Sequence, residues 1–253
     1  MEIAIYILIF IMGSFIGSFL TLAVYRIPRK ENIIYKHSYC PKCNHKLSVL
    51  DLFPIFSYVF LKGRCRYCKE KIRPRYLILE IISGIVFLLL AISFNFDFNN
   101  IYVHKIFLFI FTSLYFITLI LIAGIDKENI NIQKSVLIFA LFMQAIYMIY
   151  LYVVGKANIY RYIMYLILIV ILLIINKRIK KKTNKEKYVI NILVLCSYIS
   201  SFTNREIFIL TVAIGLVFIA ISAIKNKKIP IGFYLCMSNI AIVLINNFLV
   251  WKG

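Results

Sequence analysis

Residues 101–125 read IYVHKIFLFIFTSLYFITLILIAGI, an almost unbroken apolar run. A helix needs about 20 such residues to cross the hydrocarbon core of a bilayer. Comparable runs recur along the chain, and we expect eight membrane spans, which makes the protein an all-α polytopic membrane protein. The expected spans are Ile3–Tyr25, Leu77–Phe94, Ile101–Ile125, Ser135–Val154, Ile159–Ile175, Tyr188–Phe202, Ile207–Ile224 and Ile231–Val250. In the first span, Gly13 and Gly17 form a small-xxx-small pattern that favours close helix packing.

The composition excludes other classes of protein. Of the 253 residues, 62% are hydrophobic and only 16% are charged, which rules out a water-soluble globule and a disordered chain. The net charge of +20 would indicate nucleic-acid binding in a soluble protein. Here the basic residues lie between apolar runs, so we read them as determinants of topology and expect no nucleic-acid partner.

The distribution of the 30 lysines and arginines predicts the orientation. Between Arg26 and Arg75 there are 13, and 12 more occupy the later connections on the same side, whereas only five lie on the other side. By the positive-inside rule the first group is cytoplasmic, with both termini outside. Anionic lipid headgroups are a natural partner for these cations.

The long first connection divides the chain into a first transmembrane helix (1–25), a cytoplasmic loop (26–76) and a seven-helix membrane domain (77–253). The loop contains two CxxC pairs, Cys40/Cys43 and Cys65/Cys68, and this arrangement is typical of a tetrahedral Zn²⁺ site. Two disulfides are the alternative, although a cytoplasmic loop faces a reducing compartment. With four cysteines available, His37 and His45 are expected to be surface residues. Cys196 and Cys236 lie within predicted spans and are expected to be packing residues.

These residues resemble the type IV prepilin peptidases, which are membrane aspartic proteases that also methylate their product. The resemblance is carried by Gly13–Leu20, Tyr25–Arg29, Cys40–Cys43, Asp51–Pro54, Lys62–Cys68, Ile72, Arg75–Tyr76 and Glu80, and more thinly by Ile125-Asp126, Ile132 and Ile229–Gly232. The resemblance implies a place in the bacterial plasma membrane and cleavage of a prepilin leader at its cytoplasmic boundary. It also implies methylation of the new N-terminus with S-adenosylmethionine, and it makes Asp126 the first catalytic aspartate.

The second catalytic aspartate of that family lies in a GxGD motif, and this chain lacks the motif. Its only aspartates are Asp51, Asp97 and Asp126. The motif's place falls near 184–187, where Glu186 is the only carboxylate. Hydrolysis needs two carboxylates that hold one water and share a proton.

Three interpretations therefore stay open. Glu186 substitutes for the missing aspartate, or the chain is a degenerate paralogue that serves as a non-enzymatic pilus or secretion assembly factor, or only methyl transfer survives. For Glu80, two roles are open: an ion pair with Arg73 or Arg75, or a position facing the active site.

Overall fold

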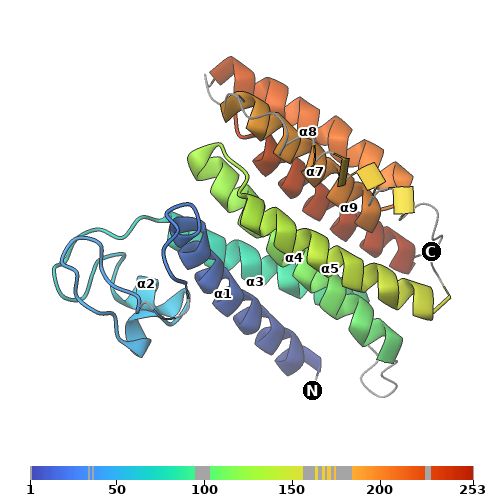
Figure 1. Cartoon of the computed structure of the whole chain (residues 1–253). Coiled ribbons are helices and arrows are strands. Elements are labelled where there is room, and N and C mark those ends of the chain that lie inside the picture. Colours follow the sequence, from blue (N-terminus) through green and yellow to red (C-terminus); the bar gives the residue numbers. More distant parts are fainter. Residues whose placement is uncertain are drawn as a thin grey trace. The chain divides into compact units, whose positions relative to one another are not determined.

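The structure, a computed structural model, describes residues 2–33, 35, 37–94, 103–155, 184–225 and 229–252, with scattered residues between 163 and 174. The described residues form eight α-helices and one short 3-10 helix, which confirms the all-α prediction (Figure 1). The elements are α1 (Glu2–Arg26), η1 (Val49–Asp51), α2 (Phe56–Phe60), α3 (Arg75–Phe94), α4 (Val103–Asn129), α5 (Lys134–Val153), α7 (Asn184–Phe202), α8 (Arg205–Lys225) and α9 (Ile231–Lys252).

Six of the described helices are long and apolar enough to cross a membrane: α1, α3, α4, α5, α8 and α9. Helix α7 covers the predicted span Tyr188–Phe202 but is not among the six, because it begins with the charged residues Lys185, Glu186 and Lys187 and also contains Asn191 and several serines. The predicted span Ile159–Ile175 lies mostly outside the described residues.

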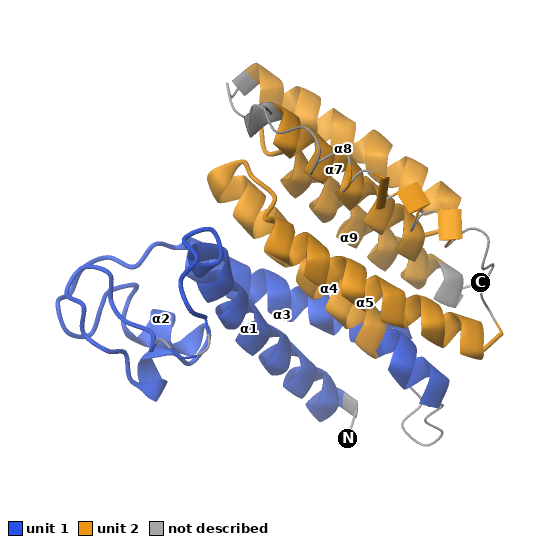
Figure 2. Ribbon diagram, in the orientation of Figure 1, with its two compact units in different colours: residues 1–109 blue, residues 110–253 orange. Residues whose placement is uncertain are grey.

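The chain divides into two compact units, residues 1–109 and 110–253 (Figure 2). In the first unit, α1 packs closely on α3 through glycines. A Cβ atom added to Gly13 would lie 2.8 Å from Cβ of Phe87, and one added to Gly17 would lie 2.9 Å from Cα of Glu80. Only glycine permits so close an approach, which confirms the packing predicted from the Gly13/Gly17 pattern.

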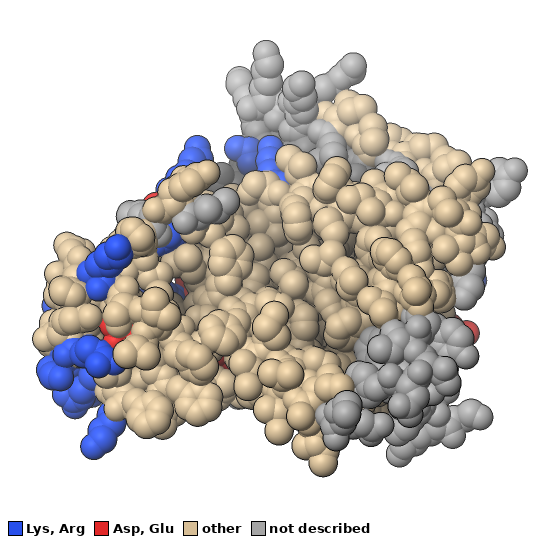
Figure 3. Space-filling model, turned by 90° about the horizontal axis from the view of Figure 1, so that it is seen from below, with Lys and Arg blue, Asp and Glu red and all other residues tan. Residues whose placement is uncertain are grey.

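The loop between α1 and α3 is anchored at its beginning by Arg26. This side chain is only 1% exposed, and its guanidinium donates hydrogen bonds to the carbonyls of Asn32 and His37 at 3.1 and 3.0 Å. Most of the described lysines and arginines of the loop are exposed, and Figure 3 shows cations on the visible surface as blue patches among mostly uncharged side chains. The basic character expected for this connection is therefore visible on its surface.

In the second unit, buried polar pairs join the helices. Thr118 of α4 shares a 2.8 Å hydrogen bond with Tyr198 of α7. Tyr115 of α4 donates to Asn239 of α9 at 2.7 Å, and the amide of Asn239 donates to Thr211 of α8 at 3.1 Å. Inside an apolar environment an unpaired polar group is costly, so these pairs fix how α4, α7, α8 and α9 align.

Candidate metal centre and buried aspartate

Each CxxC pair forms a knuckle, and the two knuckles have the same geometry. In the first, the amide of Cys40 donates to the carbonyl of His45, and that of Asn44 donates to Cys40. In the second, the amide of Cys65 donates to Glu70, and that of Lys69 donates to Cys65. The residue after each second cysteine has positive φ, 56° at Asn44 and 59° at Lys69. The backbone therefore turns back on itself twice in the same way and presents two pairs of thiols.

The two knuckles bring the predicted four cysteines together. Their Sγ atoms all lie within 4.8 Å of one another, and Sγ of Cys40 is 3.8 Å from Sγ of Cys68. In a tetrahedral zinc site with Zn–S bonds of about 2.3 Å, neighbouring sulfurs are about 3.8 Å apart. All six cysteines are free thiols, so the described structure contains no disulfide between the knuckles. The donor set and its spacing fit a structural zinc ion.

The thiols of the cluster differ in pKa. Burial disfavours the thiolate of Cys40, but hydrogen bonds from the backbone of Cys43 and Lys42 outweigh it and lower the pKa of Cys40 to about 7. The backbone of Glu70 favours the Cys68 thiolate, but desolvation and the neighbouring thiols prevail and raise the pKa of Cys68 to about 12. A divalent cation bound by all four sulfurs would replace these protons.

Asp51 links the second knuckle to the segment around η1. Its carboxylate accepts hydrogen bonds from the amide and hydroxyl of Ser48 at 3.0 and 2.8 Å. The same carboxylate binds Nε of Arg66 at 2.6 Å and accepts a hydrogen bond from the hydroxyl of Tyr67 at 3.3 Å. Burial raises the pKa of Asp51, but the bonds from Ser48 and Arg66 outweigh it and hold that pKa below its ordinary value. Asp51 thus acts as a structural carboxylate of the loop.

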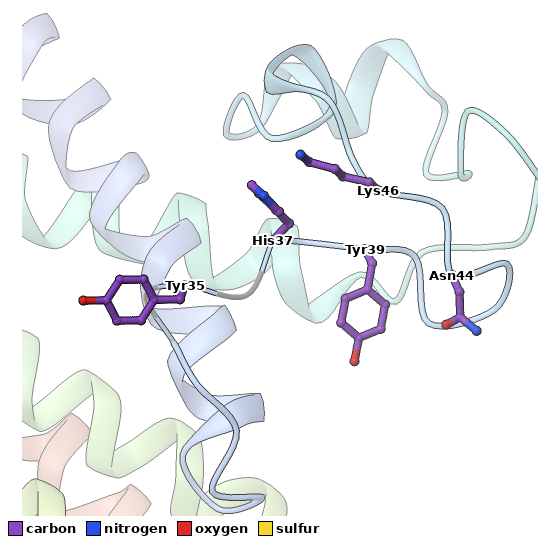
Figure 4. Close-up of a pocket in the computed structure, with 5 residues that line it drawn as sticks. All are labelled: Tyr35, His37, Tyr39, Asn44 and Lys46. Carbon is purple, nitrogen blue, oxygen red and sulfur yellow. The ribbon is translucent and has the colours of Figure 1, made fainter.

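The two histidines of the loop are exposed, and among the described residues the metal-capable cluster contains cysteines alone. The ring of His45 lies on the ring of Tyr67, with centroids 3.6 Å apart. His37 lines an open cavity of about 650 Å³ with Tyr35, Tyr39, Asn44 and Lys46. In Figure 4, Tyr39 and Asn44 point to one side of the chain, whereas His37 and Lys46 point to the other.

Glu80 of α3 is buried, and its carboxylate accepts a hydrogen bond from the backbone amide of Ile55 at 2.8 Å. Ile55 has φ of +63°, which is strained for a β-branched residue. The carboxylate of Glu80 therefore holds a strained turn of the loop against α3. The role of Glu80 is structural, as in the ion-pair hypothesis, but the group bound by its carboxylate is the backbone amide of Ile55.

Asp126 lies one turn before the end of α4 and is completely buried. Its Oδ2 accepts hydrogen bonds from the hydroxyl of Tyr188 at 2.9 Å and from the amide of Phe233 at 3.0 Å. The Tyr188 hydroxyl also accepts a bond from the amide of Ile231 at 2.9 Å. The carboxylate thus sits at the N-terminus of α9, where helix amides favour negative charge. Its other oxygen, Oδ1, is buried without a hydrogen-bond partner among the described residues.

Gly232 lets Asp126 approach α9 this closely, because a Cβ atom there would lie 3.0 Å from Oδ2 of Asp126. This glycine belongs to the Ile229–Gly232 segment singled out from the sequence. Glu186 lies in the first turn of α7 and is exposed, and it is not among the hydrogen-bond partners of Asp126 in the described structure. Sequence reasoning missed Tyr188, whose only signal was its place two residues after Glu186.

Comparison with known proteins finds relatives of the N-terminal third. Residues 11–94 match the family described as Bacterial Peptidase A24 N-terminal domain. Over 94 residues the chain is 39% identical to a prepilin leader peptidase/N-methyltransferase of Vibrio cholerae, covering 34% of this chain and 37% of that protein. Proteins of the same name match from Myxococcus xanthus (35% over 81 residues, 32% of this chain and 24% of that protein) and Bacillus subtilis (36% over 88 residues, 35% and 36%).

The chain thus spans roughly a quarter to two fifths of the length of the curated relatives it matches. No solved structure matches the chain. The matched residues include most of α1, the four-cysteine loop and α3, and all of them lie within the first unit. The buried Asp126 and the half-buried Tyr188 lie outside the matched range.

Proposed function

We propose that this chain, whose residues 11–94 belong to the bacterial peptidase A24 N-terminal domain family, engages prepilin-like membrane proteins at the cytoplasmic boundary of the plasma membrane. The observation that carries the proposal is the similarity of the N-terminal third to relatives named prepilin leader peptidases. This third contains most of α1, the four-cysteine loop and α3. The six membrane-length helices support an integral membrane protein, and the basic loop supports a cytoplasmic site.

We further propose that engagement takes place without hydrolysis. An aspartic protease holds its water between two carboxylates that share a proton, so that one accepts and the other donates. The hydrogen bonds to Asp126 come from a phenol and a backbone amide, which are neutral donors. A tyrosine hydroxyl at this place stabilises the carboxylate but offers no second carboxylate for proton sharing. The chain would then serve as an assembly factor in a pilus or secretion machine.

One observation favours hydrolysis as a second candidate. Oδ1 of Asp126 is buried without a hydrogen-bond partner among the described residues, which leaves one acceptor able to orient a water. Glu186, in the first turn of α7, is the proposed second carboxylate. Methyl transfer from S-adenosylmethionine is the remaining activity that the relatives' names suggest, and it needs no carboxylate pair.

Co-expression with a prepilin-like substrate, a short basic leader followed by an apolar helix, separates these candidates. We expect the substrate to copurify at its full size, and Tyr188→Phe to leave its size unchanged. A shortened substrate that depends on Asp126 would instead establish proteolysis.

In that case Glu186→Gln tests the second carboxylate. The matched control is Glu206→Gln, which alters another exposed glutamate in the first turn of a helix. Loss of cleavage in the first variant alone would assign Glu186 to the site. Transfer of a labelled methyl group from S-adenosylmethionine to the substrate tests the third activity.

A further inference from the structure

The loop carries a contiguous apolar surface that its own fold leaves uncovered. We call it the aromatic patch. It consists of exposed side chains from η1, α2 and the turn between them: Val49, Leu50, Phe53, Phe56, Val59 and Phe60. Four of these residues line one shallow cavity of about 360 Å³, which shows that they are contiguous. Phe60 is 79% exposed and Phe56 is 53% exposed. Exposed apolar side chains gathered in this way are typical of a surface that binds a partner or a membrane.

The patch is continuous with a membrane-spanning helix. The ring of Phe53 packs edge-on against the ring of Phe15 in α1, with centroids 5.3 Å apart. Phe15 lies eleven residues before Arg26, the last residue of α1, a separation of about 16 Å along a helix axis. With Arg26 at the membrane boundary, Phe15 is about half-way through a hydrocarbon core of about 30 Å. Phe53 therefore reaches well below the level at which α1 ends.

The hydrogen bonds of the same turn are compatible with a position inside the bilayer. Irregular backbone inside a bilayer persists only where its polar groups are satisfied by protein. The amide of Ile55 is bound by the carboxylate of Glu80, which lies five residues, or about 8 Å, inside the start of α3. The amides of Ser57 and Val59 donate to the carbonyls of Phe53 and Ile55, both at 3.0 Å. The turn thus presents apolar side chains outward while its amides are bound internally.

Cations follow the patch directly. Lys62 and Arg64 come immediately after α2 and are exposed, and Arg66 lines the same cavity as the aromatic side chains. Apolar side chains backed by cations are the pattern of an element that lies in the interface of an anionic membrane.

We infer that residues 49–60 insert the aromatic patch into the lipid leaflet on the loop's side of the membrane, with Lys62 and Arg64 at the level of anionic headgroups. The occupant of the patch is lipid, and the loop is held flat against the bilayer between α1 and α3. This inference does not depend on the proposed prepilin engagement.

Tryptophan placed in the patch tests this directly. The full chain with Trp251→Phe and Phe60→Trp is reconstituted in vesicles of phosphatidylcholine and phosphatidylglycerol, with and without brominated acyl chains. We expect the tryptophan emission to be shifted to the blue. We also expect most of the emission intensity to be lost in the brominated vesicles. The matched control is Tyr35→Trp, because Tyr35 is 83% exposed in the same loop. It lines the cavity beside His37, to which no residue of the aromatic patch contributes. Its emission should stay red-shifted and unquenched.

Phe56→Trp provides a second reporter should Phe60→Trp fail to fold, and it should behave as Phe60→Trp does. Red-shifted, unquenched emission from the patch would overturn the inference, because the patch would then lie in water. Blue-shifted emission that brominated lipid does not quench would also overturn it, since protein and not lipid would then cover the patch.

Discussion

At the scale of single residues, Asp51 shows how one carboxylate can organise a small metal-binding loop. Its side chain is 3% exposed and takes bonds from Ser48, Arg66 and Tyr67. Two of these donors lie between the cysteines of the second knuckle, so the carboxylate links that knuckle to η1. A loop of this size has little core of its own, and a link of this kind contributes a large part of its stability.

We expect Asp51→Asn to destabilise the loop by about 1–3 kcal/mol, because an amide cannot accept all the bonds that the carboxylate accepts. Zinc transfer from the purified protein to a chromophoric chelator at neutral pH should become faster. Lys46→Gln, which alters an exposed loop residue, is the control and should leave the rate unchanged. An unchanged rate for Asp51→Asn would show that the carboxylate does not support the knuckles.

The pH dependence follows from the lowered pKa of Asp51. Stabilisation by the ionised carboxylate is fully present above its pKa in the unfolded chain, about 3.9, and is lost as pH falls through the lower folded value. The difference in stability between the unaltered protein and the Asp51→Asn variant at neutral pH therefore reflects the full contribution of the charge.

Residue-level prediction from the sequence succeeded where spacing determines chemistry. The two CxxC pairs identified Cys40, Cys43, Cys65 and Cys68, and the structure brings all four thiols together. The same reasoning missed Tyr188, because the apposition of Asp126 and α7 depends on how α4, α7 and α9 align. A tyrosine near the end of an apolar run has no sequence signature that separates a half-buried hydrogen-bond donor from an interfacial anchor.

At the scale of helices, the glycines of α1 decide how the first unit packs. We expect Gly17→Ala to destabilise the α1–α3 pair by about 1–3 kcal/mol, because the new methyl would press on the α3 backbone at Glu80 Cα, 2.9 Å away. The control is Gly215→Ala in α8, where the nearest atom, at 3.0 Å, is the movable tip of Leu235. Thermal unfolding of the purified proteins compares the two variants, and equal melting temperatures would contradict this account of α1–α3 packing.

Helix existence was predictable because apolar runs of membrane length leave few alternatives. The ends of the helices were harder to predict from the sequence. The structure continues α4 through Asn129, which places Asp126 one turn inside the helix and not at its boundary. The amides at the start of α9 bind the carboxylate and compensate for its burial there. This compensation arises from residues about a hundred positions away, beyond the reach of local sequence patterns.

At the scale of the whole molecule, metal and membrane stabilise different parts of the chain. We expect the four-cysteine loop to depend on the cation that its thiols would hold, because a loop of about 50 residues buries too little apolar surface to fold alone. The helices form their backbone hydrogen bonds internally and do not depend on zinc. Loss of metal should therefore unfold the loop while the helices persist.

Limited trypsin digestion after chelation measures this separation. We expect trypsin to cut the chelated protein between Lys42 and Arg73, where exposed lysines and arginines are frequent, while helical circular dichroism is retained. Cys65→Ser should show the same cleavage without chelator and a reduced zinc content. Cys196→Ser, which removes a thiol from α7 outside the cluster, should behave as the unaltered protein. Equal zinc contents in the two serine variants would refute a four-cysteine site, and loss of helical signal on chelation would show that the helices also need the metal.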